Sequence, residues 1–230
     1  MAIRPRRLLL VLAPLVCLSV FSTRADASFI AAVCQDLTCS SSPIIVSDNG
    51  AGDTIPGTGA ISFSVAAFGY SLVVNTSQSK PVVGSSSAPQ LDLTFTATGS
   101  GTIFLYAGDT DFTGGAQAFT LSLAETSSGG SGAATGRAWG GTTNNALTFS
   151  PLISSIVLSG VAASSTATGT YNPTVNPYSL SIGVQIVRTT AGTTTGDLNF
   201  STAATPEPTS LAMLGIGLGF CGFAVRRRKA

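Results

Sequence analysis

Apolar residues alternate with small or polar residues along most of this chain, and this period of two most constrains its fold. The clearest run places apolar side chains at every second position, at Tyr178, Leu180, Ile182, Val184 and Ile186. Alternate side chains of a β-strand point to opposite faces, so the run indicates a strand with one buried face. Residues 28–205 show no long stretch with a helical period of 3.6. We therefore expect an all-β domain.

Further short runs of the same kind are separated by clusters of turn-forming residues. The runs cover residues 61–65, 68–74, 91–95, 102–107, 119–123, 147–149, 154–161 and 198–200. The clusters include SDNGAGD (47–53), ATGSG (97–101) and NPTVNP (172–177). Many short strands joined by such turns are typical of a β-sandwich or a jelly roll. We predict one β-sandwich or jelly-roll-like domain over residues 28–205.

Three local features refine this expectation. The apolar positions change from odd to even numbers after Ala66-Ala67, which indicates a bulge or bend near Ala66–Gly69. The continuous apolar run TIFLYA (102–107) suits a strand that is covered on both faces. We expect a long loop at the Gly- and Ser-rich stretch 126–137.

The first 27 residues predict a signal peptide. Arg4, Arg6 and Arg7 precede the apolar run Leu8–Phe21, and Ala25-Asp26-Ala27 supplies small residues for cleavage. A membrane anchor is the alternative, but the apolar run of 14 residues is short for spanning a bilayer. We expect an exported domain that begins at Ser28.

The charge of residues 28–205 excludes one class of partner. Three basic residues stand against eight acidic ones, which gives a net charge of −5. An acidic domain without a basic patch repels phosphate backbones, so we expect no binding of nucleic acid.

Cys34 and Cys39 are the two cysteines of the expected domain, since Cys17 and Cys221 fall in the terminal segments. In an oxidising compartment they should form a local disulfide. The alternative is a metal or redox pair, but no histidine or further thiol lies near them.

The chain contains no histidine, which excludes a Ser-His-Asp triad and a Cys-His dyad within it. The sequence has no phosphate-binding loop of the G-x-x-x-x-G-K-[ST] type either. We therefore assign no catalytic residue and expect no obligatory cofactor. A glycoside hydrolase that uses paired carboxylates remains an alternative.

Asp109, Asp111 and Thr113 occupy alternate positions before Gly114, in DTDFTG. The pattern matches the first half of a Ca²⁺-binding loop, with threonine as the third ligand. The alternative is an ordinary hairpin turn, which aspartates also favour. Trp139 lies in the Gly-rich stretch GRAWGG (136–141), where its ring could stack on a sugar. A buried Trp is the commoner use of this residue, and we favour it.

Two threonine-rich runs, TFTAT (94–98) and GTTTG (192–196), also stand out. Threonines spaced along a flat strand could bind ice. Both runs are short, and we rank this use below the others.

The last 25 residues have three parts in a fixed order. Pro206-Glu207-Pro208 comes first, followed by the uncharged run Leu211–Val225 and then by four cations. The cations Arg226, Arg227, Arg228 and Lys229 resist translocation, so we expect a transmembrane helix with its C-terminus in the cytoplasm. No L-P-x-T-G sortase motif is present, and a GPI signal would end in its apolar stretch. A permanent single-pass anchor is the alternative to a processing signal.

This order resembles the PEP-CTERM sorting domain of Gram-negative bacteria. The resemblance implies recognition by an exosortase, an integral-membrane enzyme that would cut near Pro206-Glu207-Pro208 outside the inner membrane. Parts of residues 44–115 also resemble, more loosely, a recurring kind of PEP-CTERM protein without an assigned activity.

The sequence thus predicts an exported protein that crosses the inner membrane transiently and ends at the cell surface or in the extracellular matrix. We expect a non-catalytic structural or adhesive role, with exosortase and exopolysaccharide as partners. The alternative is a carbohydrate-binding module assisted by Ca²⁺.

Overall fold

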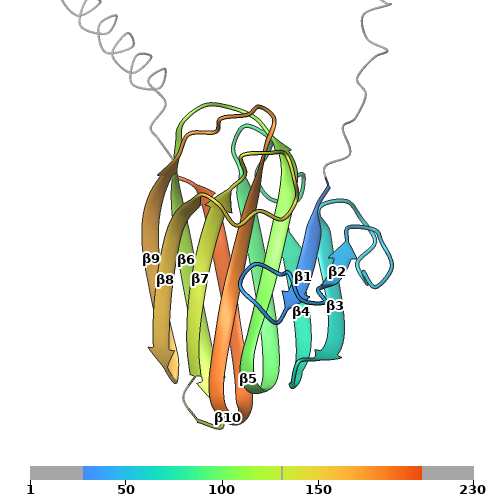
Figure 1. Ribbon diagram of the computed structural model, residues 1–230, viewed down its shortest axis with the longest axis vertical. Coiled ribbons are helices and arrows are strands. Elements are labelled where there is room, and N and C mark those ends of the chain that lie inside the picture. The colour runs from blue at the N-terminus through green and yellow to red at the C-terminus, as the bar shows by residue number, and fades with distance from the viewer. Residues whose placement is uncertain (1–27, 131, 204–230) are drawn as a thin grey trace, which may run out of the picture.

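The computed structural model describes residues 28–130 and 132–203, and these residues form antiparallel strands without a helix (Figure 1). The ten strands are β1 (Ile30–Cys34), β2 (Ile44–Ser47), β3 (Ala60–Ala67), β4 (Tyr70–Gln78), β5 (Gln90–Phe112), β6 (Gln117–Ser128), β7 (Gly132–Gly140), β8 (Leu152–Gly160), β9 (Ala162–Tyr171) and β10 (Tyr178–Thr202). The prediction of an all-β fold is confirmed.

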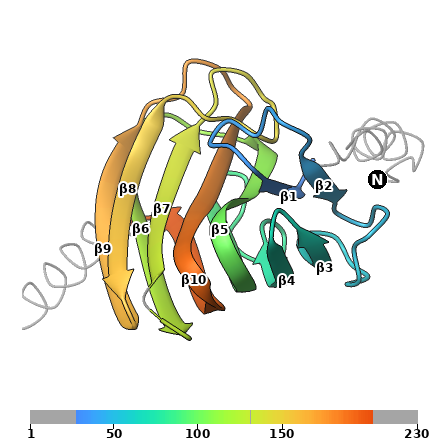
Figure 2. The same ribbon diagram turned by 60° about the horizontal axis from the view of Figure 1, so that its bottom comes forward.

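The sheet is continuous but folds over into two layers (Figures 1 and 2). Strands β5 and β10 belong to both layers, because one half of each strand lies in one layer and the other half lies in the other layer. Residues 90–99 of β5 pair with β4 and with the second half of β10. Residues 101–112 pair with β1 and with the first half of β10. Layer A therefore has the order β3-β4-β5-β10-β6-β9, and layer B has the order β2-β1-β5-β10-β7-β8.

Both long strands bend at one end of the sandwich. In β5 the bend lies at residues 99–101, and Gly101 adopts a φ of 105° that is strained for any residue with a Cβ. In β10 the pairing register shifts between Arg188 and Gly192. The sequence predicts a turn at 97–101 between separate strands, whereas the structure carries the strand pairing around the corner.

The core lies between the layers and is built from the alternating apolar positions. Leu93 and Phe95 of layer A and Ile182 and Val184 of layer B are all fully buried in one cluster. Each such side chain contributes about 1.5–3 kcal/mol through removal from water. The period of two in the sequence therefore corresponds to one strand face turned into this core.

The run TIFLYA is covered on both faces, as predicted. Ile103 and Leu105 belong to the core between the layers. Phe104 and Tyr106 belong to a second apolar cluster on the outer face of layer B. Segments outside the strands, including Leu147 and Phe149, complete this outer cluster.

Three local predictions are wrong. The change of parity after Ala67 is a two-residue hairpin turn and not a bulge, because Phe68 and Gly69 both have positive φ, 54° and 82°. Residues 126–137 are not a long loop, since β6 and β7 cover nearly all of them. Residues 147–149 form no strand and lie in the segment between β7 and β8.

No helix within residues 28–130 and 132–203 is long and apolar enough to cross a membrane. The expected signal peptide and the expected tail helix lie outside the described residues.

Candidate ligand-contacting face

Asp109 is fully buried near the end of β5, where its carboxylate has protein partners. Its Oδ2 accepts hydrogen bonds from Ser79 Oγ at 2.6 Å and from Lys80 Nζ at 2.8 Å. Lys80 also donates to the carbonyl of Thr110, and its ammonium lies 4.0 Å from the centre of the Phe112 ring. A buried pair with these added contacts stabilises the native state only as a unit, because loss of one partner leaves an uncompensated charge.

Asp111 has a different partner from Asp109. Its Oδ1 accepts a hydrogen bond from Asn144 Nδ2 at 2.7 Å, and its backbone N–H donates to Asn144 Oδ1 at 2.9 Å. Thr113 is exposed and its backbone N–H donates to Ser86 O. Within the part of the chain that the structure describes, no three acidic or cysteine side chains gather as a metal site. A Ca²⁺ site at Asp109, Asp111 and Thr113 stays a prediction.

Trp139 lies in the outer cluster of layer B and is 4% exposed. Its ring packs against Tyr106 at a centroid distance of 5.9 Å and against Phe149 at 5.7 Å. The ring therefore offers no open face for stacking on a sugar, which agrees with the buried interpretation that the sequence favours.

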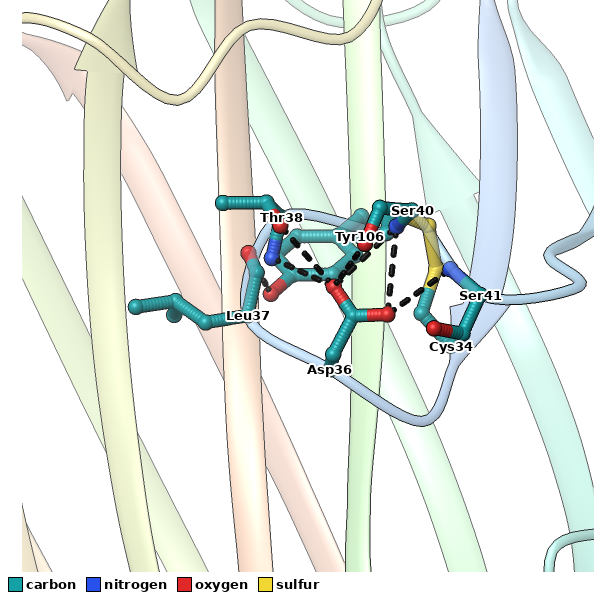
Figure 3. Close-up of a disulfide and its surroundings, with 8 residues drawn as sticks. Cys34, Asp36, Leu37, Thr38, Ser40, Ser41 and Tyr106 are labelled. Atoms are coloured by element: carbon teal, nitrogen blue, oxygen red, sulfur yellow. Dashed lines mark hydrogen bonds between the residues drawn. A yellow bond between two sulfur atoms is a disulfide. The ribbon is translucent and has the colours of Figure 1, made fainter.

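The segment after β1 covers this cluster and is closed by a disulfide between Cys34 and Cys39 (Figure 3). The hydroxyl of Tyr106 donates a hydrogen bond to the carbonyl of Leu37 at 2.7 Å, which fixes the loop over the aromatic rings. Burial raises the pKa of Tyr106, so the hydroxyl keeps its proton for this bond. The predicted pairing of the two cysteines is confirmed.

Asp36 organises the inside of the same loop (Figure 3). Its carboxylate accepts backbone hydrogen bonds from Thr38 at 3.0 Å, Ser40 at 3.0 Å and Ser41 at 2.8 Å. These bonds, that from Ser40 first, hold the pKa of Asp36 well below its usual value. The acid thus stabilises the loop that the disulfide closes.

The outer face of layer A is open and carries mostly hydroxyl groups. Because the apolar positions of β5, β6 and β10 turn into the core, the intervening positions face solvent. These outer side chains include Thr94, Thr96, Thr98, Thr120, Ser122, Thr126, Thr193, Thr195 and, on β9, Ser164, Thr166 and Thr168. We call this set the hydroxyl face.

The hydroxyls of the hydroxyl face are aligned in rows across the strands. Thr96 pairs with Thr195, and Thr195 pairs with Thr126 on the next strand. The hydroxyls of Thr96 and Thr195 are 3.4 Å apart, and those of Thr98 and Thr193 are 2.9 Å apart. The two threonine runs noted in the sequence are thus neighbours, although the chain separates Thr96 from Thr195 by 99 residues.

Asp92 and Asp197 are the acidic side chains within this face. Asn199 Nδ2 donates to Asp92 at 3.4 Å, and Thr94 Oγ1 donates to Asp197 at 3.5 Å. The pKa of Asp92 is raised to about 7, first by burial and then by the negative charge of Asp197 beside it. Asp92 therefore keeps its proton to a higher pH than an isolated aspartate does. Neither residue stands out in the sequence, because nothing local in it indicates that the two side chains meet.

Two shallow grooves meet at Asp197. One has a volume of about 370 Å³ and is lined by Ser122, Leu123, Ala124, Ser164, Ser165, Thr166 and Asp197. The other has a volume of about 260 Å³ and is lined by Thr94, Ala124, Glu125, Thr126, Thr195, Gly196 and Asp197. The wall of the first groove offers hydroxyl donors and acceptors, whereas the exposed surface of the second groove is mostly apolar. The first groove therefore suits a neutral polar ligand better than an anion.

A separate polar group lies inside the sandwich near the bend. Arg188 is 2% exposed and donates to Thr194 Oγ1 at 2.9 Å and to the carbonyl of Ser128 at 2.8 Å. The Glu125 carboxylate is buried there without a hydrogen bond, and burial raises its pKa while Arg188 opposes the rise. Arg188 thereby links β10 to the end of β6 at the bend, so its side chain stabilises the fold.

Residues 204–229 match the family model described as the PEP-CTERM protein-sorting motif. The chain therefore carries this motif at the place that Pro206-Glu207-Pro208 and the cationic end predict. The motif lies outside the residues that the structure describes. No curated protein matches the sequence.

Solved structures resemble the domain only distantly. A CBM4 protein shares 15% identity with a TM-score of 0.31 over 55% of this chain and 78% of that one. The CBM22-1–CBM22-2 tandem domain of Xyn10C from Paenibacillus barcinonensis shares 12% identity with a TM-score of 0.36, over 68% of this chain and 44% of that one. The enzymatically active domain of tailspike protein 4 from bacteriophage CBA120 shares 10% identity with a TM-score of 0.32, over 64% of this chain and 20% of that one. Likeness at this level does not bear on what the chain binds.

Proposed function

We propose that this protein is an exported, non-catalytic component of the cell surface or extracellular matrix, which contacts polysaccharide through its hydroxyl face. The observation that carries the proposal is the hydroxyl face itself, an open sheet surface of Thr and Ser rows with two grooves. Each hydroxyl can donate one hydrogen bond and accept two, which matches the groups that a hydrated polysaccharide presents.

The strength of such contacts supports a structural role. A single hydrogen bond exchanged with water contributes about 0.5–1.5 kcal/mol, so one site binds weakly and an array binds through many contacts. The small charge of the face also means that attraction does not depend on ionic steering. A polysaccharide repeats its hydroxyls along its length, so it can use many rows at once.

The placement of the carboxylates supports a role without catalysis. Asp109 is neutralised by Lys80 inside the protein. Asp92 and Asp197 lie side by side on an open face, whereas a glycosidase places two carboxylates on opposite sides of the bond to be cut. Cys34 and Cys39 are joined in a disulfide, so neither is a free thiol nucleophile.

The sorting motif supports the route to the outside. An exosortase would cut near Pro206-Glu207-Pro208 after the cationic end has stopped transfer through the inner membrane. Prolines keep this segment out of a helix, which leaves it accessible to a processing enzyme. The domain would then leave the inner membrane for the surface or the matrix.

Two experiments test the proposal. Replacing Pro206-Glu207-Pro208 by alanines should leave the full-length protein in the inner membrane, and normal release of this variant would contradict the sorting step. Separately, the exported protein should sediment with the cell's own exopolysaccharide. A Thr96→Val/Thr126→Val/Thr195→Val variant should be retained less, with Thr102→Val on the other layer as its control. Equal retention of the two variants would remove the hydroxyl face from the proposal.

A further inference from the structure

Strand β9 forms one edge of layer A and lacks the charges, prolines and bulges that commonly protect a sheet edge. Its ten residues pair with β6 in one continuous register without a bulge. The sequence AASSTATGTY contains no charged residue and no proline. Charges, prolines and bulges are the means by which proteins keep a free edge from pairing with another strand. The free side of β9 is therefore a template for a further strand.

The opposite edge of layer A shows what protection looks like in the same molecule. Strand β3 has a register shift between Ile61 and Phe63, and the preceding loop is bonded to it there. Thr54 N–H donates to the carbonyl of Ser62 at 2.8 Å, and Ser62 N–H donates to Asp53 at 3.1 Å. Within residues 28–130 and 132–203, no loop is hydrogen-bonded to the backbone of β9 on its free side. The β3 edge of layer A is therefore covered by a loop, whereas the β9 edge, within the same residues, is not.

Charge favours a second copy of this chain as the strand that covers β9. The domain carries a net charge of −5, so most pairs of its surfaces repel each other. Residues 152–171, which include β8 and β9, contain no charged side chain at all. Two copies can bring this side together without opposing like charges, and the backbone of an antiparallel strand is complementary to itself about a two-fold axis.

We infer that β9 pairs with β9 of a second copy and joins the two A layers into one sheet. Side-chain alternation restricts the position of the axis, because outer residues must lie opposite outer residues. The axis therefore passes through a residue, and Thr166 is the central outer residue of β9. Thr166 then lies opposite its counterpart, and the rows of the hydroxyl face run on across the joint. This inference does not depend on what the hydroxyl face binds.

The first test uses a cysteine at the axis in the full chain. Thr166→Cys should be cross-linked between two chains by a short bismaleimide whose spacer reductant cleaves, because directly opposed side chains of paired strands have Cβ atoms about 4.5–5.5 Å apart, slightly too far for a direct disulfide. The matched control is Ser122→Cys, since Ser122 pairs with Thr166 on the adjacent inner strand and shares its face. We expect a band of doubled mass for Thr166→Cys that reductant removes, and none for the control. Absence of that band, or equal bands for both variants, overturns the inference.

The second test measures mass without a cross-link. The exported protein should have twice the mass of one chain in sedimentation analysis. Thr166→Lys should halve this mass, because it places two like charges opposite each other at the axis. Ser122→Lys adds the same charge one strand away and should leave the mass doubled. A monomeric native protein, or equal dissociation by both lysines, overturns the inference.

Discussion

The two outer faces of this sandwich are built around the same pair of long strands, but one face is open to solvent and the other is covered. In layer A, the outer positions of β5 and β10 carry threonines such as Thr96 and Thr195, and the face is open. In layer B, the outer positions of β5 carry Phe104 and Tyr106, and the segments after β1 and β7 cover them. The comparison shows that the chain closes the apolar face with loops and leaves the hydroxyl face for contact.

The two faces also differ in how the side chains of β5 pack against the neighbouring strand β10. The ring of Tyr106 lies over Gly183 of β10, where an added Cβ would come within 2.1 Å of the ring. The absence of a side chain at Gly183 therefore gives Tyr106 its place. On layer A the corresponding neighbours are threonines that touch through hydroxyls, so nothing needs a cover.

The largest expected effect is the loss of a side chain beneath the covering loop. Tyr106→Ala should lower the free energy of unfolding by about 3–5 kcal/mol, because it leaves a cavity beside Trp139 and frees Leu37. Thr96→Ala, on the open face of the same strand, should change it by no more than about 0.5 kcal/mol. Denaturant unfolding of both variants measures the contrast. Similar losses for the two would mean that the open face is also structural.

The sequence predicts where strands lie but not which strands pair with each other, and the two faces show why. Alternation assigns Leu93 and Phe95 to a buried face because the signal is local. The meeting of Asp92 with Asp197 depends on the pairing of β5 with β10, which the local pattern does not contain. The hairpin at Phe68 was missed for a different reason, since a bulky residue with positive φ is rare and no Asn-Gly pair marks the turn.

The disulfide of the covering loop should have the next largest effect. Replacing Cys34 and Cys39 by serine should lower the free energy of unfolding by about 2 kcal/mol, the value expected for closing so short a loop. The change should also expose the aromatic cluster, which tryptophan fluorescence of Trp139 reports. Reductant should reproduce the loss in the native protein and leave the serine variant unchanged. Full stability of the reduced protein would show that the Tyr106 hydroxyl alone holds the loop.

A smaller effect concerns the acid pair of the open face. The folded-state pKa of Asp92, about 7, lies above its usual value of 3.8, so the folded protein holds a proton that the unfolded chain releases. This contribution to stability is present below about pH 4 and is lost as the pH rises through about 7. Asp92→Asn should remove the loss and gain about 1–2 kcal/mol relative to the native protein between pH 4 and pH 8, after allowance for solvent screening.

The neighbouring carboxylate provides the control for that pH dependence. Asp197→Asn removes the second cause of the raised pKa of Asp92 and leaves the first, which is burial. The pH dependence should therefore shrink in this variant without vanishing. Urea unfolding at several pH values measures both variants. An unchanged dependence in Asp92→Asn would place its origin at another group, such as the buried Glu125, whose pKa is also raised.

The smallest effect should be invisible in stability and visible in contact. Thr195→Val keeps the shape and β-branching of the side chain but removes its hydroxyl, which lies 3.4 Å from that of Thr96. Because the position is exposed, the free energy of unfolding should change by no more than about 0.5 kcal/mol. Each lost hydrogen bond to a ligand should weaken retention on exopolysaccharide by about 1 kcal/mol, or about fivefold. Thr102→Val, outside layer A, should show neither change. A different result would be retention that is unchanged in Thr195→Val but weaker in Asp197→Asn. The ligand would then contact the acid pair and not the hydroxyl rows, and the open face would bind through charge.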